Sequence, residues 1–373
     1  MDWRAFIDGR RLLRADLLPL RLDGFFCLAD PGDLDALQDD EGHDTHNPWV
    51  CDHCNGLVLL FSGVVVNPAT GQSVRLPPFP AETPRGMGRC YEHEYLAYDP
   101  VASPHYEVVL IPELADNKES EWPPSPFRTH VFSSRKWRWE ERSFHREGDQ
   151  ASGTIADTKS SGCKRTRNQA VYLRGALYVL YPNNSVLRIT LWNDKYQIIK
   201  LPDQVSEQSY AYLGKSQKGV YCASLSNGWT RFQAWLLDES RGKMEWVLKS
   251  DINLEGMVET SPSYDHADRY NTPWILNYEK DVSEALTEDD SEWDFESGIV
   301  LDETKDKVTT RYKEIFFLGF HPYKEIAFFL VSFWRVVSYH LNSSKIQELG
   351  ILSKSILESF PYTPCWVELF ENN

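Results

Sequence analysis

Short hydrophobic runs recur along the chain, and a polar turn separates each run from the next. In residues 64–77, the run Val64-Val65-Val66 precedes Asn67-Pro68-Ala69-Thr70-Gly71, and apolar and polar residues then alternate. β-branched residues favour strands, whereas Asn, Pro and Gly favour turns. This stretch is therefore predicted to be a β-hairpin. Asn55-Gly56, followed by the apolar run 57–61, predicts a second turn and strand, and residues 24–28 predict a further short strand.

Groups of four such strands follow one another at a regular spacing. They occupy residues 95–140, 170–202, 212–248 and 315–349. A period of roughly 40 to 50 residues with four strands per unit is typical of a β-propeller blade. The sequence predicts an all-β fold, a β-propeller of about six four-stranded blades, with five to seven possible. The final apolar run, 365–370, is expected to be a strand that completes a blade begun on the N-terminal side.

Three segments depart from this rhythm. Residues 3–18 are predicted to form a helix, because apolar residues recur every three to four positions until Pro19. Residues 146–168 are rich in Gly, Ser, Thr and Lys and are expected to be a loop between blades. Residues 279–306 carry twelve acidic residues against two lysines. Such a run indicates a solvated loop or, alternatively, a contact for a basic partner.

Composition and charge narrow the functional classes. The chain has 373 residues, of which 42% are hydrophobic and 25% charged, as in ordinary globular proteins. Its net charge of −16 argues against a broad surface for nucleic acid or an anionic membrane. No apolar run approaches the roughly 18–20 residues of a membrane span. Seven scattered cysteines and the lack of a recognisable signal segment predict a cytoplasmic or nuclear location, or both.

Candidate chemistry is sparse. Cys51 and Cys54, with His43 and His46 upstream, have the residue types of a zinc site. The favoured interpretation is nevertheless a buried cysteine before a strand, because a second ligand pair at a set spacing is lacking. Neither a glycine-rich phosphate loop nor a Gly-x-Ser-x-Gly motif occurs. No catalytic residue, metal or cofactor is therefore assigned, although a propeller enzyme or a zinc protein stays an alternative.

Several segments together resemble plant F-box proteins that carry an F-box-associated, kelch-like propeller domain. The most specific are Cys54-Asn55-Gly56-Leu57 and Asn67-Pro68-Ala69-Thr70-Gly71, and the likeness runs from about residue 3 to about residue 370. The resemblance implies that an N-terminal F-box binds a Skp-family adaptor, which docks to a cullin scaffold. It also implies that the propeller holds a target protein for ubiquitination.

The resemblance divides the chain into two parts. Residues 1–19 look like the last helix of an F-box whose opening half is expected to be missing, and residues 20–373 look like the propeller domain. The resemblance gives adaptor binding to five side chains: Trp3, Phe6, Ile7, Leu12 and Leu13. The leading hypothesis is a non-catalytic substrate-recognition subunit of a Skp-cullin-F-box ubiquitin ligase. The alternative is a stand-alone protein-interaction module that does not recruit a ligase.

Overall fold

The computed structural model is built from β-strands throughout the part of the chain that it describes. It describes residues 21–22, 25–28, 50–60, 63–79, 92–112, 121–148, 164–165, 170–181, 184–205, 209–216, 218–226, 230–240, 242–254, 257, 299–300, 315–332, 335–351 and 358–369. The helix predicted for residues 3–18 lies outside these ranges, as does most of the loop predicted for residues 146–168.

Five four-stranded antiparallel units make up most of the fold, and each is a run of consecutive strands. Blade 1 contains β3 (Val50–Cys54), β4 (Leu57–Leu60), β5 (Val64–Asn67) and β6 (Gln72–Arg75). Blade 2 contains β7 (Glu92–Ala97), β8 (Glu107–Pro112), β9 (Phe127–Ser133) and β10 (Arg138–Arg146). Blade 3 contains β12 (Ala170–Leu173), β13 (Ala176–Tyr181), β14 (Ser185–Thr190) and β15 (Lys195–Lys200). Blade 4 contains β16 (Tyr210–Ser216), β17 (Gly219–Leu225), β18 (Arg231–Asp238) and β19 (Glu245–Asn253). Blade 5 contains β21 (Ile315–Phe320), β22 (Ile326–Val331), β23 (Arg335–His340) and β24 (Lys345–Ile351).

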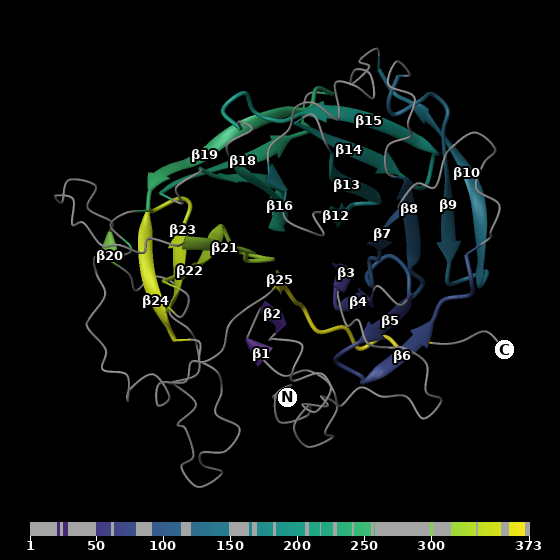
Figure 1. Cartoon of the computed structure of the whole chain (residues 1–373), viewed down its shortest axis with the longest axis horizontal. Coiled ribbons are helices and arrows are strands. Elements are labelled where there is room, and N and C mark those ends of the chain that lie inside the picture. Colours follow the sequence, from purple (N-terminus) through teal and green to yellow (C-terminus); the bar gives the residue numbers. More distant parts are fainter. Residues whose placement is uncertain are drawn as a thin grey trace, which may run out of the picture.

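The blades stand around a common centre (Figure 1), with β3, β7, β12, β16 and β21 innermost and β6, β10, β15, β19 and β24 outermost. A parallel pairing of β10 with β15 joins blades 2 and 3 at their outer edges into one eight-stranded sheet. Two short strands extend other blades: β11 (Lys164–Arg165) pairs with β16, and β20 (Ile299–Val300) pairs with β24. The fold is therefore the predicted all-β propeller.

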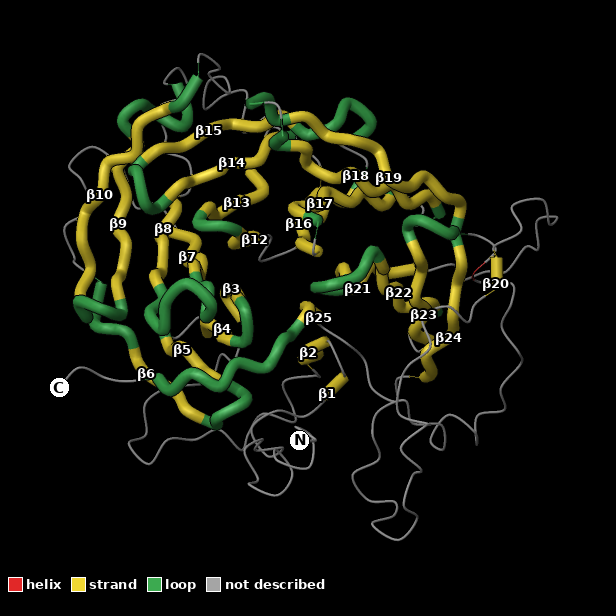
Figure 2. Tube along the Cα trace, turned by 180° about the vertical axis from the view of Figure 1, so that it is seen from behind, coloured by secondary structure: helices red, strands yellow, loops and turns green. Residues whose placement is uncertain are grey.

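A sixth, three-stranded sheet joins the two ends of the chain. It contains β1 (Arg21–Leu22), β2 (Phe25–Leu28) and β25 (Glu358–Pro361), and β25 pairs antiparallel with β2. Figure 2 shows this sheet between blades 5 and 1, where it completes the ring. Closure of a late segment onto an early one is thus confirmed, as is the short strand predicted in residues 24–28. The prediction of a strand at residues 365–370 is wrong for residues 365–369, which have no regular structure, and residue 370 lies outside the described residues.

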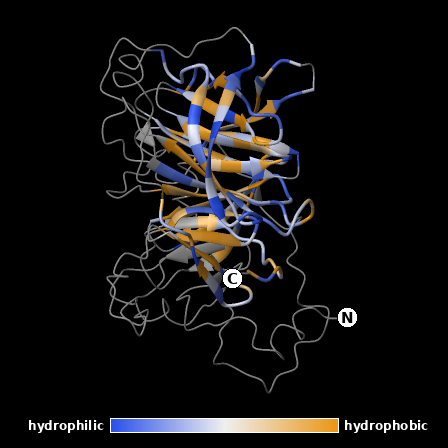
Figure 3. Ribbon diagram, turned by 90° about the vertical axis from the view of Figure 1, so that its right-hand side faces the viewer, coloured by the Kyte–Doolittle hydropathy of each residue, from blue (hydrophilic) through white to orange (hydrophobic). Residues whose placement is uncertain are grey.

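The hydrophobic core consists of separate layers between neighbouring blades. Val109, Phe127 and Leu187 belong to the layer between blades 2 and 3, and Phe232 and Phe329 belong to the layer between blades 4 and 5. The middle strands β13, β17 and β22 are buried at every position, whereas the outer strand β19 is mostly exposed. Figure 3 shows hydrophobic and hydrophilic stretches interleaved through the side of the disc. Burial is therefore complete in these middle strands and lower in the outer strand, because the sheets pack face to face around an axis.

The irregular segment after β25 is fastened to blade 1 by the two sequence segments that carry the family resemblance. The Asn67 side-chain amide donates to the carbonyls of Cys365, at 3.0 Å, and Val367, at 2.8 Å. The Cys54 thiol donates to the Tyr98 carbonyl at 3.2 Å, and the Tyr98 hydroxyl lies 3.2 Å from Cys365 Sγ. These residues therefore hold the closure of the ring.

Candidate recognition face

One end of the propeller carries the first and third turns of every blade. In a four-stranded antiparallel blade the first and third turns lie at the same end, because the chain reverses direction at each turn. We call this end the short-turn face, and among the described residues it comprises 55–56, 68–71, 98–106, 134–137, 174–175, 191–194, 218, 239–240, 242–244, 321–325 and 341–344.

Contacts between blades confirm that these turns share one face. The Ser216 hydroxyl donates to the Lys324 carbonyl at 2.9 Å, and Lys218 Nζ lies 2.6 Å from Glu325 Oε2. On the other side of the axis, the Asn55 side-chain amide donates to the Tyr98 carbonyl. The first turns of blades 4 and 5 are therefore bonded to each other, as are those of blades 1 and 2.

Three of the six exposed large hydrophobic side chains among the described residues lie on this face, and two others, Val247 and Leu248, lie on the outer strand β19. Val101, Trp192 and Tyr323 lie on turns of blades 2, 3 and 5 and are 94%, 78% and 58% exposed. Trp366 is 44% exposed and lies on the segment that Asn67 holds against blade 1. Single exposed apolar residues are common on proteins, but aromatic residues are enriched where proteins bind one another. Their shared face makes it the candidate recognition surface.

A cavity of about 70 Å³ lies at the centre of the short-turn face. Its lining comes from the C-terminal ends of the inner strands of blades 1, 4 and 5, from most of the short inner strand of blade 3, and from residues at and after the end of β25: His53, Cys54, Asn55, Ala170, Val171, Tyr172, Leu213, Gly214, Lys215, Gly319, Phe320, Pro322, Pro361 and Thr363. The inner strands approach closely here, because a Cβ on Gly214 would lie 2.5 Å from the Phe320 ring. Five sheets thus jointly position one site.

The polar groups of this cavity are one cation and several neutral groups. Lys215 Nζ donates to the Asn55 side-chain oxygen and, at 3.4 Å, to the Tyr172 carbonyl. The His53 ring stacks on Phe360, with ring centres 4.3 Å apart. Burial, together with the nearby Lys215 charge, lowers the pKa of His53 to about 3, so the imidazole is neutral at physiological pH. Burial also raises the pKa of the Cys54 thiol to about 11.

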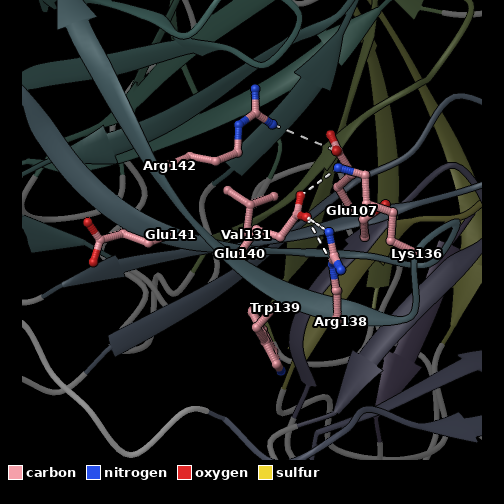
Figure 4. A pocket seen from close by; sticks show the side chains of 9 residues that line it. Glu107, Val131, Lys136, Arg138, Trp139, Glu140, Glu141 and Arg142 are labelled. Atoms are coloured by element: carbon pink, nitrogen blue, oxygen red, sulfur yellow. Dashed lines mark hydrogen bonds and ion pairs between the residues drawn. The ribbon is translucent and has the colours of Figure 1, made fainter.

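A larger groove of about 790 Å³ lies over blade 2, but its charges are compensated internally. In Figure 4, the Glu140 carboxylate accepts from Lys136, at 2.7 Å, and from Arg138, at 2.6 Å. Arg142 lies 3.7 Å from Glu107 and also pairs with Asp194 of blade 3. Burial raises the pKa of Glu107, although the Arg142 charge opposes this shift. Since its cations already have partners, this groove is the weaker candidate.

Most of the predicted site residues lie outside the described residues. This holds for the five predicted adaptor contacts Trp3, Phe6, Ile7, Leu12 and Leu13, for His43 and His46, and for the acidic run 279–306 except β20. Cys51 and Cys54 lie on β3 and are not in a disulfide. Within the described ranges, no group of three or more His, Cys, Asp and Glu side chains could hold a metal ion.

Sequence reasoning missed the cavity residue Lys215 and the exposed Tyr323. Lys215 follows a predicted short strand, where a lysine is ordinary, and only its place beside the axis distinguishes it. Tyr323 lies in the turn between β21 and β22. No local pattern marks either residue. In the part of the chain that the structure describes, no helix has the length and apolar character needed to cross a membrane.

Comparison with known proteins agrees with an F-box relationship at a distance. No family model matches the chain. An Arabidopsis thaliana protein named "Putative F-box protein" is 24% identical over 222 residues, which is 56% of this chain and 54% of that protein. The chain therefore spans about half the length of the relative that it matches. The fold defines a β-propeller with a candidate recognition face, and this similarity connects the chain to a plant F-box protein.

Lowering the pH from 7 to 5 is expected to destabilise the fold through His53. Its folded-state pKa of about 3 lies below the ordinary histidine value of about 6.5, so the unfolded chain binds the extra proton in this interval. The stabilisation is complete above pH 6.5 and declines as the pH falls; allowing for partial exposure, the loss is on the order of 1–2 kcal/mol by pH 5. Thermal unfolding of the wild type and of His53→Gln between pH 7 and pH 5 measures this loss of stability.

The variant should show a flatter dependence of melting temperature on pH than the wild type. His105→Gln is the matched control, because His105 is an exposed residue of the same face. An unchanged pH slope in His53→Gln would contradict the assignment of His53 as a partly buried, neutral histidine.

Proposed function

We propose that this chain is the non-catalytic substrate-recognition subunit of a Skp-cullin-F-box ubiquitin ligase, acting in the cytoplasm, the nucleus or both. The similarity to a plant F-box protein carries the proposal. The propeller supports it, because a closed ring of blades is a rigid frame for a binding face built from turns. In this proposal the kelch-like propeller binds the target protein through the short-turn face.

The mechanism is proximity. A bound target would be held near the ubiquitin-conjugating enzyme that the cullin scaffold carries, and the local concentration of its lysines would rise. No side chain of this chain takes part in bond chemistry in this mechanism. Its contribution is the affinity and the orientation with which the target is held.

Co-purification with a Skp-family adaptor tests the proposal. The chain co-expressed with the adaptor should form a complex, and the double variant Phe6→Ala/Ile7→Ala should weaken it by roughly 30-fold or more if each anchor contributes about 1–2 kcal/mol. Trp192→Ala is the control, because Trp192 lies on the blade 3 turn and should leave adaptor affinity unchanged.

Two other outcomes are decisive. If neither this chain nor a form extended to a complete F-box binds the adaptor, the ligase role is refuted and a stand-alone interaction module replaces it. If the adaptor binds equally well to wild type and to the double variant, the predicted adaptor contacts are wrong.

A further inference from the structure

Lys215 differs from the paired cations of the short-turn face in the partners that it contacts. Lys218 pairs with Glu325, and Lys136 pairs with Glu140. The two acceptors of Lys215, by contrast, are the Asn55 side-chain oxygen and the Tyr172 carbonyl, which are both neutral. No salt bridge of Lys215 occurs among the described residues. A partly buried cation without a carboxylate partner favours an anion from outside the chain.

We propose that the axial cavity binds the carboxylate of an acidic residue in an extended segment of a partner protein, with Lys215 as its ion-pair partner. This inference rests on the proposed role as a recognition subunit and specifies the chemistry of the target.

The size and polarity of the cavity match a carboxylate. A volume of about 70 Å³ exceeds the minimum that one water needs and suits one small polar group. Apart from Lys215, the polar side chains that line it include the neutral imidazole of His53 and the amide of Asn55. One ammonium balances one carboxylate, whereas a phosphate with about two negative charges needs further cations. We therefore assign the site to Asp or Glu rather than to a phosphorylated residue.

The rim of the cavity offers contacts for the residues that flank the acidic one. Tyr323 is exposed and adjoins the lining residue Pro322, and its hydroxyl lies 3.5 Å from Thr363 Oγ1, another lining residue. Trp366 follows three residues later on the same segment. Flat, exposed aromatic side chains beside a small polar pocket suit an extended peptide, because they bury apolar area at a low cost in conformational entropy.

The charge of the face is also complementary to an acidic segment. The whole chain has 55 acidic residues against 39 basic ones. The described turns of the short-turn face reverse this balance, with six basic residues and four acidic ones: Arg135, Lys136, Arg174, Lys218, Lys243 and Lys324 against Asp99, Asp194, Glu239 and Glu325. An acidic segment would therefore meet less repulsion at these turns than the net charge of the whole chain suggests.

Selection from a random peptide library tests the proposal with the full chain. The library contains Asp, Glu, Gln and phosphoserine among its residues, and binding of selected peptides is then measured by fluorescence anisotropy. We expect enrichment of Asp or Glu at one position. Lys215→Gln should weaken these peptides roughly 10- to 100-fold, as for loss of a charge-assisted hydrogen bond. Lys243→Gln, on an exposed turn of blade 4, should not weaken them.

Charge reversal adds a readout that a structural role would not produce. Lys215→Glu, checked for folding by its melting temperature, should select peptides with Lys or Arg at the same position. The proposal is overturned if no acidic position is enriched, if Lys215→Gln binds the selected peptides as well as wild type, or if phosphoserine displaces Asp and Glu. These results are independent of adaptor binding, so acidic-peptide binding would keep this inference even if both this chain and the extended form failed to bind the adaptor and the ligase role were refuted.

Discussion

Replacing Gly56 with alanine is expected to destabilise the propeller by about 2–5 kcal/mol, the sum of a left-handed backbone penalty and an overpacking penalty. Gly56 has φ +93°, in the region that side chains with a Cβ rarely adopt. A Cβ there would also lie 2.5 Å from both the Thr363 carbonyl oxygen and Cys365 Cβ. Because these atoms belong to the closing segment, that segment must move away from blade 1. Urea unfolding measures the loss.

Gly63→Ala separates the two contributions to this effect. Gly63 has φ +70°, but a Cβ on it would meet nothing within 4 Å. It should therefore cost only the backbone penalty, about 1–2 kcal/mol. If both variants lost the same stability, the contact between Gly56 and the closing segment would contribute nothing to the free energy of unfolding.

Asn67→Ala is expected to cost about 2–4 kcal/mol, because it leaves buried polar groups without partners. The Asn67 side chain is fully buried. It donates to the carbonyls of Cys365 and Val367, and its oxygen accepts from the Ala69 amide at 3.1 Å. The variant should also speed hydrogen exchange in residues 362–369, which hydrogen-exchange mass spectrometry would measure together with urea unfolding.

Ser73→Ala on the neighbouring strand is the matched control, because Ser73 is exposed and should change stability by less than about 0.5 kcal/mol. If exchange of residues 362–369 were unchanged in Asn67→Ala, the closing segment would not depend on this side chain. The stability loss would then belong to the β5–β6 turn alone.

The structural roles of Asn67, Gly56 and Cys54 limit what the F-box similarity says about the target protein. These residues belong to the most specific segments of the resemblance, and in the structure they hold blade 1 to blade 2 and to the closing segment. In this chain they therefore stabilise the frame of the propeller. Target choice is proposed to depend on the turns and the axial cavity, where Lys215 and Tyr323 lie. A relative with the same frame could accordingly hold a different target.

The sequence by itself determined the fold class and most of the strands. The hairpin within residues 64–77 appears as β5 and β6, and the Asn55-Gly56 turn joins β3 to β4. Both predictions are confirmed because alternation of side chains and turn chemistry are local properties, which the chain expresses wherever the strand lies. The acidic run 279–306 and the adaptor contacts in residues 3–13 stay predictions.

Only the tertiary structure decided which segment closes the ring and which side chains meet at its centre. Residues 365–370 have a strand-like pattern, yet residues 358–361 pair with β2, and the following segment is instead fixed by Asn67 about 300 positions earlier in the chain. Lys215 likewise meets Asn55 from a distant blade. Hydrophobic periodicity specifies that a strand is buried, but the partner that buries it depends on the packing of all the blades at once.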